Sequence, residues 1–185
     1  HGVIGKNGAG KTVLLRLLCG LMHPSKGQVI VDGKQLGKDV DFAPDAGIII
    51  ETPCFLPYLS GFQNLKELAS IRNIISKEEI AEAMEQVKLD PSSRKHVGKY
   101  SLGMRQRLGI AQAIMERPRY LILDEPMNGL DTQGMEDVRE LLQKQKETGV
   151  TVILASHSME DIRLLCDTVH RIQDASLIPC TTEFS

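Results

Sequence analysis

The densest group of residues that could do chemistry lies within the first dozen positions. Residues 5–12 match the pattern G-x-x-x-x-G-K-[ST] in full. In such a loop, glycines let backbone N–H groups surround phosphate oxygens, the lysine reaches the β- and γ-phosphates, and the hydroxyl ligates Mg²⁺. The pattern therefore predicts a nucleoside triphosphate site rather than a plain glycine-rich turn. The predicted nucleotide-binding residues are Gly5, Lys6, Asn7, Gly8, Ala9, Gly10, Lys11, Thr12 and Val13.

A second candidate site follows an apolar run, where residues 121–123 lead into Asp124 and Glu125. An acid at the carboxyl end of a strand that faces a phosphate-binding loop can hold Mg²⁺ directly or through water. The next acid can polarise an attacking water molecule. The alternative is a buried strand that ends in solvated carboxylates. The phosphate-binding loop in the same chain favours the catalytic interpretation.

Strands that alternate with helices must position these groups, which predicts a mainly parallel sheet with helices on both faces. Apolar periodicity predicts helices at 11–22, 102–116, 132–148 and 158–166, and strands at 2–4, 28–32, 47–51, 120–124, 150–155 and 168–173. Between residues 52 and 98 the β-branched runs disappear and two amphipathic helices are predicted, near 61–73 and 77–88. We therefore expect an α/β core formed by 1–51 and 99–180, with 52–98 as an inserted helical subdomain.

The overall composition is that of an ordinary globular protein, with 42% apolar and 25% charged residues. A formal net charge of −2 implies no general attraction to nucleic acid or to an anionic membrane. The four cysteines are widely and irregularly spaced, which argues against a zinc site or a disulfide framework and favours a reducing cytosol. No run approaches the 18 apolar residues or so that a membrane-spanning helix needs.

The order of these motifs resembles the ATP-binding domain of ABC transporters, from residue 2 to about residue 175. Between the two phosphate motifs, residues 100–107 read YSLGMRQR, which is similar to the signature segment of that family. The resemblance implies a P-loop NTPase core with an inserted α-helical subdomain. It also implies that two such domains pack head to tail and bury two ATP molecules, with Mg²⁺, at their interface.

The resemblance assigns roles to further residues. The signature positions would contact the γ-phosphate held by the opposite subunit, although they also suit the N-cap of a helix; they are Ser101, Leu102, Gly103 and Met104. Asp131 would lie in the D-loop, which touches the partner. Glu125 and His157 would be catalytic, His157 as the switch histidine that senses the γ-phosphate. The implied magnesium ligands are Thr12, Glu51 and Asp124.

The chain departs from the usual family pattern in three places. Glu51 stands where the family usually has glutamine, and Leu102 and Met104 replace the middle glycine and the last residue of the signature. Together these variants resemble the branch that exports bacitracin-like and lantibiotic peptides, often in self-immunity. The third departure is at the start: His1 precedes the loop by only four residues, so we expect an N-terminally truncated chain. The antiparallel sheet and the adenine-stacking aromatic of the family would then be missing, which would weaken nucleotide binding by about 1–3 kcal/mol.

The sequence thus predicts the ATP-hydrolysing subunit of an ABC transporter, cytoplasmic and peripheral to the inner face of the cell membrane. The expected partners are a second nucleotide-binding domain and a separate membrane permease, with no nucleic acid. The apolar loop at 54–59 favours a contact surface over a solvated cap. Two alternatives stay open: a truncated remnant without ATPase activity, and a non-transport ABC ATPase, whose usual tandem cassettes or strongly basic stretches are not visible.

Overall fold

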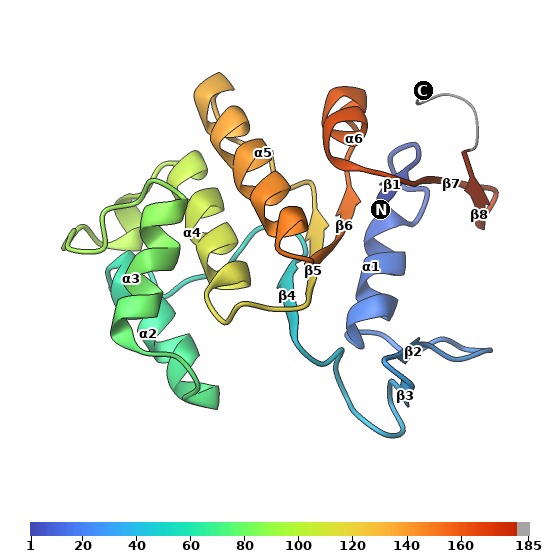
Figure 1. Cartoon of the computed structure of the whole chain (residues 1–185), viewed down its shortest axis with the longest axis horizontal. Helices are drawn as coiled ribbons and strands as arrows, with labels where there is room; N and C mark the ends of the chain where they lie inside the picture. The colour runs from blue at the N-terminus through green and yellow to red at the C-terminus, as the bar shows by residue number, and fades with distance from the viewer. Residues whose placement is uncertain (181–185) are drawn as a thin grey trace.

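The computed structural model describes residues 1–180, which form a six-stranded sheet flanked by helices (Figure 1). The strand order is β4-β5-β6-β1-β7-β8, and all neighbours are parallel except the antiparallel β7–β8 pair. The mainly parallel α/β fold predicted from the sequence is confirmed. In chain order the sheet contains β1 (Gly2–Ile4), β4 (Ala46–Ile49), β5 (Tyr120–Asp124), β6 (Thr151–Ala155), β7 (Val169–Gln173) and β8 (Ser176–Pro179).

Both faces of the sheet are covered, as its sequence requires. Successive side chains of a strand point to opposite faces, so an unbroken apolar strand must be buried on both. In β5, Ile122 packs toward α1 (Lys11–Cys19), in a cluster with Leu15. Its neighbours Leu121 and Leu123 pack in the larger cluster on the other face. That cluster also contains side chains from α4 (Leu102–Ile114), α5 (Thr132–Glu147) and α6 (Met159–Leu165).

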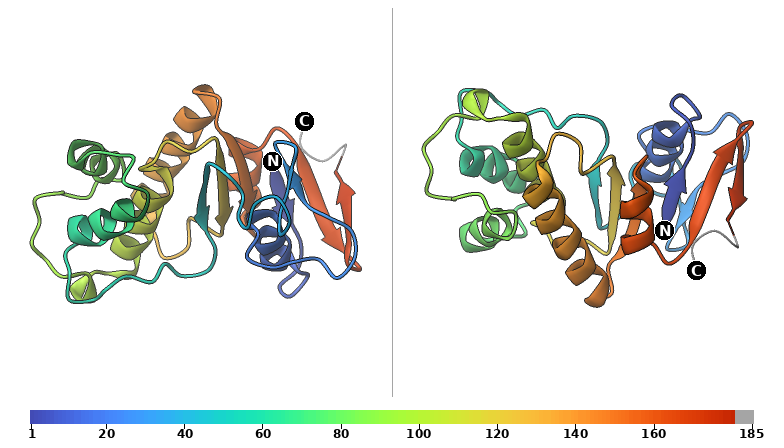
Figure 2. Two further views of the ribbon diagram at one scale, coloured as in Figure 1. Left: turned by 90° about the horizontal axis from the view of Figure 1, so that it is seen from below. Right: turned by 90° about the horizontal axis from the view of Figure 1, so that it is seen from above.

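The segment between β4 and α4 is helical, with α2 (Gly61–Arg72), α3 (Lys77–Gln86) and the short η1 (Val97–Lys99). Figure 2 shows α2, α3 and α4 gathered at one end of the molecule and the β7–β8 hairpin at the other. Each of α2 and α3 is preceded by an N-cap serine in a reciprocal capping box, Ser60 with Gln63 and Ser76 with Glu79. Such a box satisfies two otherwise unpaired backbone N–H groups and fixes where each helix starts.

The observed bounds differ from the predicted ones where the backbone turns left-handed. The helix predicted over 11–22 ends at Cys19, because Gly20 adopts a φ of 83° and its N–H caps the helix on Arg16 O and Leu17 O. The strand predicted over 28–32 is reduced to β2 (Ile30–Val31), which pairs antiparallel with β3 (Lys34–Gln35).

Among the helices of residues 1–180, none is long and apolar enough to cross a membrane.

Candidate active site

The sequence motifs meet at one edge of the sheet, where parallel strands end. The phosphate loop, residues 5–12, follows β1, while Asp124 closes β5 and His157 follows β6. Asp124 of β5 and Val3 of β1 both lie opposite Ala155 of β6, one on each side of that strand. In open α/β sheets, ligands bind in the crevice outside the carboxyl ends of the strands. The fold therefore brings the two predicted phosphate motifs together.

The phosphate loop has the backbone that its glycines predict. Gly8 and Gly10 adopt φ values of 77° and 103°, and Gly10 is the N-cap of α1. Lys11 is buried, and its Nζ donates a hydrogen bond of 2.9 Å to Gly5 O, so its ammonium group lies inside the loop. A hollow of about 720 Å³, within the usual range for ligand pockets, is lined by residues 4–9 and His157 among others.

Thr12 and Asp124 form the part of the site that fits magnesium. The Thr12 hydroxyl donates to Asp124 Oδ2 at 2.5 Å, and the Asp124 side chain is buried. Within residues 1–180 there is no cluster of three or more His, Cys, Asp and Glu side chains that could hold a metal ion. Mg²⁺ is commonly held by one or two protein oxygens together with substrate phosphates and water. A hydroxyl and a carboxylate beside a phosphate loop meet that requirement.

Glu125 and His157 form a second pair at the same edge. His157 Nδ1 lies 2.7 Å from Glu125 Oε2, and the His157 N–H donates to the same oxygen at 3.3 Å. Glu125 has a φ of 48°, which is left-handed, and its N–H donates to Ala155 O at 2.9 Å. Non-glycine residues in this conformation are uncommon and gather at functional sites. A carboxylate fixed in this way can accept a proton from a water molecule.

A largely buried ion pair between Arg139 and Asp161 lies close in sequence and in space to the turn that carries His157, and it was not predicted from the sequence. Asp161 on α6 is 1% exposed and accepts hydrogen bonds from Arg139 Nε at 2.8 Å and from Ser156 Oγ at 3.4 Å. Ser156 Oγ also accepts from Ser158 N at 3.0 Å, so the network braces the turn that carries His157. The serine N-cap pattern at 158–161 was visible in the sequence. No local pattern identifies Arg139, which comes from α5.

Glu51 does not join Thr12 and Asp124 in this structure. Strand β4 ends at Ile49, two residues earlier than predicted, and Glu51 has a left-handed φ of 62°. Its carboxylate instead forms an ion pair with Arg16, with 2.6 Å between Arg16 Nη2 and Glu51 Oε1. The two expected magnesium ligands that the fold brings into contact are thus Thr12 and Asp124.

The signature segment lies away from the phosphate loop of its own chain, since α4 and α1 lie on opposite sides of β4 and β5 (Figures 1 and 2). Ser101 is the N-cap of α4, and its Oγ accepts from Met104 N at 3.1 Å. Leu102 packs on Gly129, where an added Cβ would lie 2.5 Å from the leucine side chain. Asp131 caps α5 by accepting from Gly134 N at 2.9 Å.

Comparisons with known proteins agree with this geometry. The family model described as ABC transporter matches residues 1–128. The uncharacterized ABC transporter ATP-binding protein YybJ of Bacillus subtilis is 46% identical over 90% of this chain and 77% of its own length. The bacitracin transport ATP-binding protein BcrA of Enterococcus faecalis is 40% identical over 96% of this chain. The lantibiotic transport ATP-binding protein SrtF of Streptococcus pyogenes is 34% identical over 96% of this chain. The chain spans 58% of BcrA and 76% of SrtF.

Solved structures show the same fold. A dimeric ATP-binding cassette in a post-hydrolysis state, bound to ADP and phosphate, superposes with a TM-score of 0.83 over 95% of this chain and 82% of that one. The two sequences are 20% identical, so this likeness concerns the fold. The predicted resemblance is confirmed by the family match and by the identity to three transport ATP-binding proteins. The chain therefore belongs to the ABC transporter family, as one of its ATP-binding proteins.

Proposed function

We propose that this chain binds Mg-ATP and hydrolyses it to power a separate membrane permease. The observation that carries the proposal is that two side-chain pairs lie at the sheet edge where the phosphate loop follows β1. The pairs are Thr12 with Asp124 and Glu125 with His157. One pair supplies hard oxygen ligands and the other a base. Both lie beside a loop built for phosphate, which is the set of groups that phosphoryl transfer to water requires.

The roles in the reaction follow from the contacts. The loop N–H groups and the N-terminus of α1 bind the phosphates, and Lys11 exchanges Gly5 O for a phosphate oxygen. Thr12 and Asp124, which are in contact with each other, would hold Mg²⁺, and the ion would supply positive charge beside the phosphate oxygens. Glu125 takes the proton of the water molecule that attacks the γ-phosphorus, and ADP leaves. His157 holds the Glu125 carboxylate in place and lines the same hollow as the phosphate loop.

A second ATP-binding domain completes the site. The N-terminus of α4, with Ser101 and the N–H groups near Gly103, suits an anion but lies away from the phosphate loop of the same chain. A dimer packed head to tail would place it against the γ-phosphate of the partner. The dimeric form of the ADP-bound cassette that shares this fold supports the arrangement. Asp131, the N-cap of α5, follows Gly129 by two residues and would lie at the same interface.

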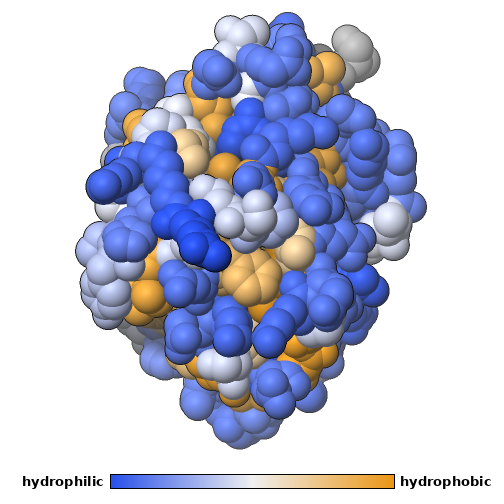
Figure 3. Space-filling view, turned by 90° about the vertical axis from the view of Figure 1, so that its left-hand side faces the viewer, coloured by the Kyte–Doolittle hydropathy of each residue, from blue (hydrophilic) through white to orange (hydrophobic). Residues whose placement is uncertain are grey.

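Residues 52–98 would form a helical subdomain between the two parts of the core, 1–51 and 99–180, and would dock on the permease at the inner face of the cell membrane. Its apolar loop leaves Leu56 44% and Tyr58 63% exposed. Figure 3 shows apolar patches between polar side chains on the end of the molecule that carries the helices of this segment. Exposed apolar side chains that gather in this way often mark partner surfaces.

For the transported substrate we propose antimicrobial peptides, in export or immunity. The support comes from the names of BcrA and SrtF and from Glu51, Leu102 and Met104, which depart from the usual family pattern. Cells that express the full-length natural protein with its permease should gain resistance to bacitracin-like or lantibiotic peptides. Unchanged sensitivity across a panel of such peptides would contradict this part of the proposal and leave the ATPase assignment standing.

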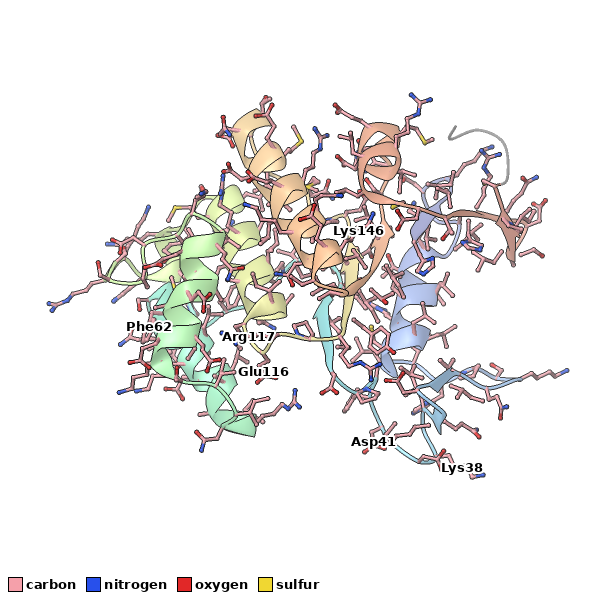
Figure 4. The ribbon with its side chains drawn as sticks, viewed as in Figure 1. Lys38, Asp41, Phe62, Glu116, Arg117 and Lys146 are labelled. Atoms are coloured by element: carbon pink, nitrogen blue, oxygen red, sulfur yellow. The ribbon has the colours of Figure 1, made fainter. Side chains whose placement is uncertain are left out.

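The ATPase assignment is tested by phosphate release from ATP with the full-length natural protein. Lys11→Ala should abolish Mg-ATP turnover, because it removes the cation inside the loop. Lys38→Ala is the matched control, since Lys38 is exposed and lies beyond the far end of α1 (Figure 4). Turnover that survives Lys11→Ala would contradict the site. No turnover in the unaltered protein would favour a remnant, and turnover without any permease association would favour a non-transport ATPase.

A further inference from the structure

Glu51 and Arg16 form an ion pair that is exposed to solvent. Arg16 Nη2 and Glu51 Oε1 are 2.6 Å apart, yet the two side chains are 36% and 62% exposed. Exposed ion pairs of this kind contribute about 0–1 kcal/mol, because water competes for both charges. The contact fixes the position of the Glu51 carboxylate in the free protein without holding it strongly.

The pair lies one helical turn from the predicted magnesium position. Arg16 follows Thr12 by four residues on α1, so the two side chains share a face of the helix about 6 Å apart along its axis. On the other side, β4 runs parallel to β5 with Ile49 opposite Leu123. The chain therefore leaves β4 at the edge where Asp124 lies, and Glu51 follows two residues later.

We propose that Arg16 is a positioning residue that holds Glu51 back from the magnesium position until Mg-ATP binds. The inference rests on the proposed function, since it assumes that the phosphate loop takes a nucleotide. Glu51 has two competing partners, the Arg16 guanidinium and a metal ion beside Thr12 and Asp124. In the free protein the guanidinium prevails. Loading the site exchanges one partner for the other.

We call this contact between Arg16 and Glu51 the latch. It should have opposite effects on nucleotide affinity with and without magnesium. Without the metal, a free Glu51 carboxylate would repel the γ-phosphate, and Arg16 offsets that charge. With the metal, Arg16 competes for the carboxylate and weakens its contribution to Mg²⁺ binding. Loss of Arg16 should therefore increase the ratio of nucleotide affinity with Mg²⁺ to affinity without it. Glutamine at position 51 carries no charge, so this dependence on Arg16 should disappear with it.

The test is equilibrium binding of a fluorescent ATP analogue to the full-length natural protein, in excess Mg²⁺ and in a chelator. Arg16→Met should raise the affinity ratio about two- to fivefold, the range that an exposed ion pair permits. In a Glu51→Gln background, Arg16→Met should leave the ratio unchanged. Lys144→Met is the matched control, because it also removes one cation from an exposed pair, the one with Glu140 on α5.

An unchanged ratio in Arg16→Met, or an equal rise in the Glu51→Gln background, would overturn the latch. Circular dichroism of each variant verifies folding, and exposed positions such as these tolerate substitution. Failure of the proposed function gives a different result. The unaltered protein and Lys11→Ala would then bind the analogue equally weakly under both conditions, and the latch would fall with the nucleotide site.

Discussion

Replacing Asp161 with alanine would leave the Arg139 guanidinium without its buried partner. The side chains are 2% and 17% exposed, so solvent cannot readily replace the lost carboxylate. Removing one partner of a buried pair typically costs about 3–5 kcal/mol of unfolding free energy. For a chain of this size, each kcal/mol lowers Tm by about 2–4 °C. We therefore expect Asp161→Ala to lower Tm by roughly 6–20 °C.

Glu160 provides a matched control on the same arginine. It pairs with Arg139 Nη2 at 2.8 Å, but its side chain is 68% exposed. Glu160→Ala should therefore change stability by no more than about 0.5 kcal/mol. Urea and thermal denaturation followed by circular dichroism would measure both variants. Equal losses at the two positions would refute the argument that burial, and not contact alone, sets the cost.

A double substitution separates the pair from its individual members. Arg139→Met combined with Asp161→Leu removes both charges and keeps the branching of the side chain at position 161, so it should recover part of the stability that Asp161→Ala loses. Ser156 Oγ loses its acceptor in either background. The turn that carries His157 should then loosen, and ATP turnover should fall even where stability returns. Turnover equal to that of Glu160→Ala would show that the network does not position His157.

Three further predictions concern packing, pH and thiol reactivity. Gly47→Ala should destabilise by about 1–3 kcal/mol in denaturation experiments, because its Cβ would lie 1.9 Å from a backbone oxygen of α4. The hydrogen bond from Arg107 lowers the pKa of Asp137, so this pair stabilises the fold above about pH 4, and that stabilisation is lost as the pH falls further. Asp137→Asn should therefore make the unfolding free energy depend less on pH in this acidic range. Burial raises the pKa of Cys19 to about 12, so iodoacetamide should label exposed Cys54 first and Cys19 only after unfolding.

Elements with an unambiguous local pattern were predictable. The apolar run that ends in Asp124 predicted the bounds of β5 as observed, since a short apolar run that ends in charged residues and a proline has few alternatives. The β3 and β8 strands were missed. Residues 34–35 pair only with another two-residue strand, and Ser176–Pro179 is exposed along its length, so neither has an apolar period to detect.

The candidate site was predictable as a set of residues but not as a set of contacts. Fixed motif spacing identified Thr12, Asp124, Glu125 and His157, which the fold then gathers at one edge. The partner of Glu51 was not predictable, because the Arg16 contact depends on where β4 ends and on how α1 packs against the sheet. Side-chain pairs between distant segments follow from tertiary packing, which leaves no periodic trace in the sequence.

The central claim, that the phosphate loop, Asp124 and Glu125 form a hydrolytic ATP site, is tested most directly by the nucleotide that the protein retains. The full-length natural protein and its Glu125→Gln variant would each be incubated with Mg-ATP and freed of unbound nucleotide, and the bound nucleotide would be identified by chromatography. We predict ADP on the unaltered protein and intact ATP on Glu125→Gln, because the amide cannot take the proton from water. ADP formed at the same rate on both proteins would contradict the account.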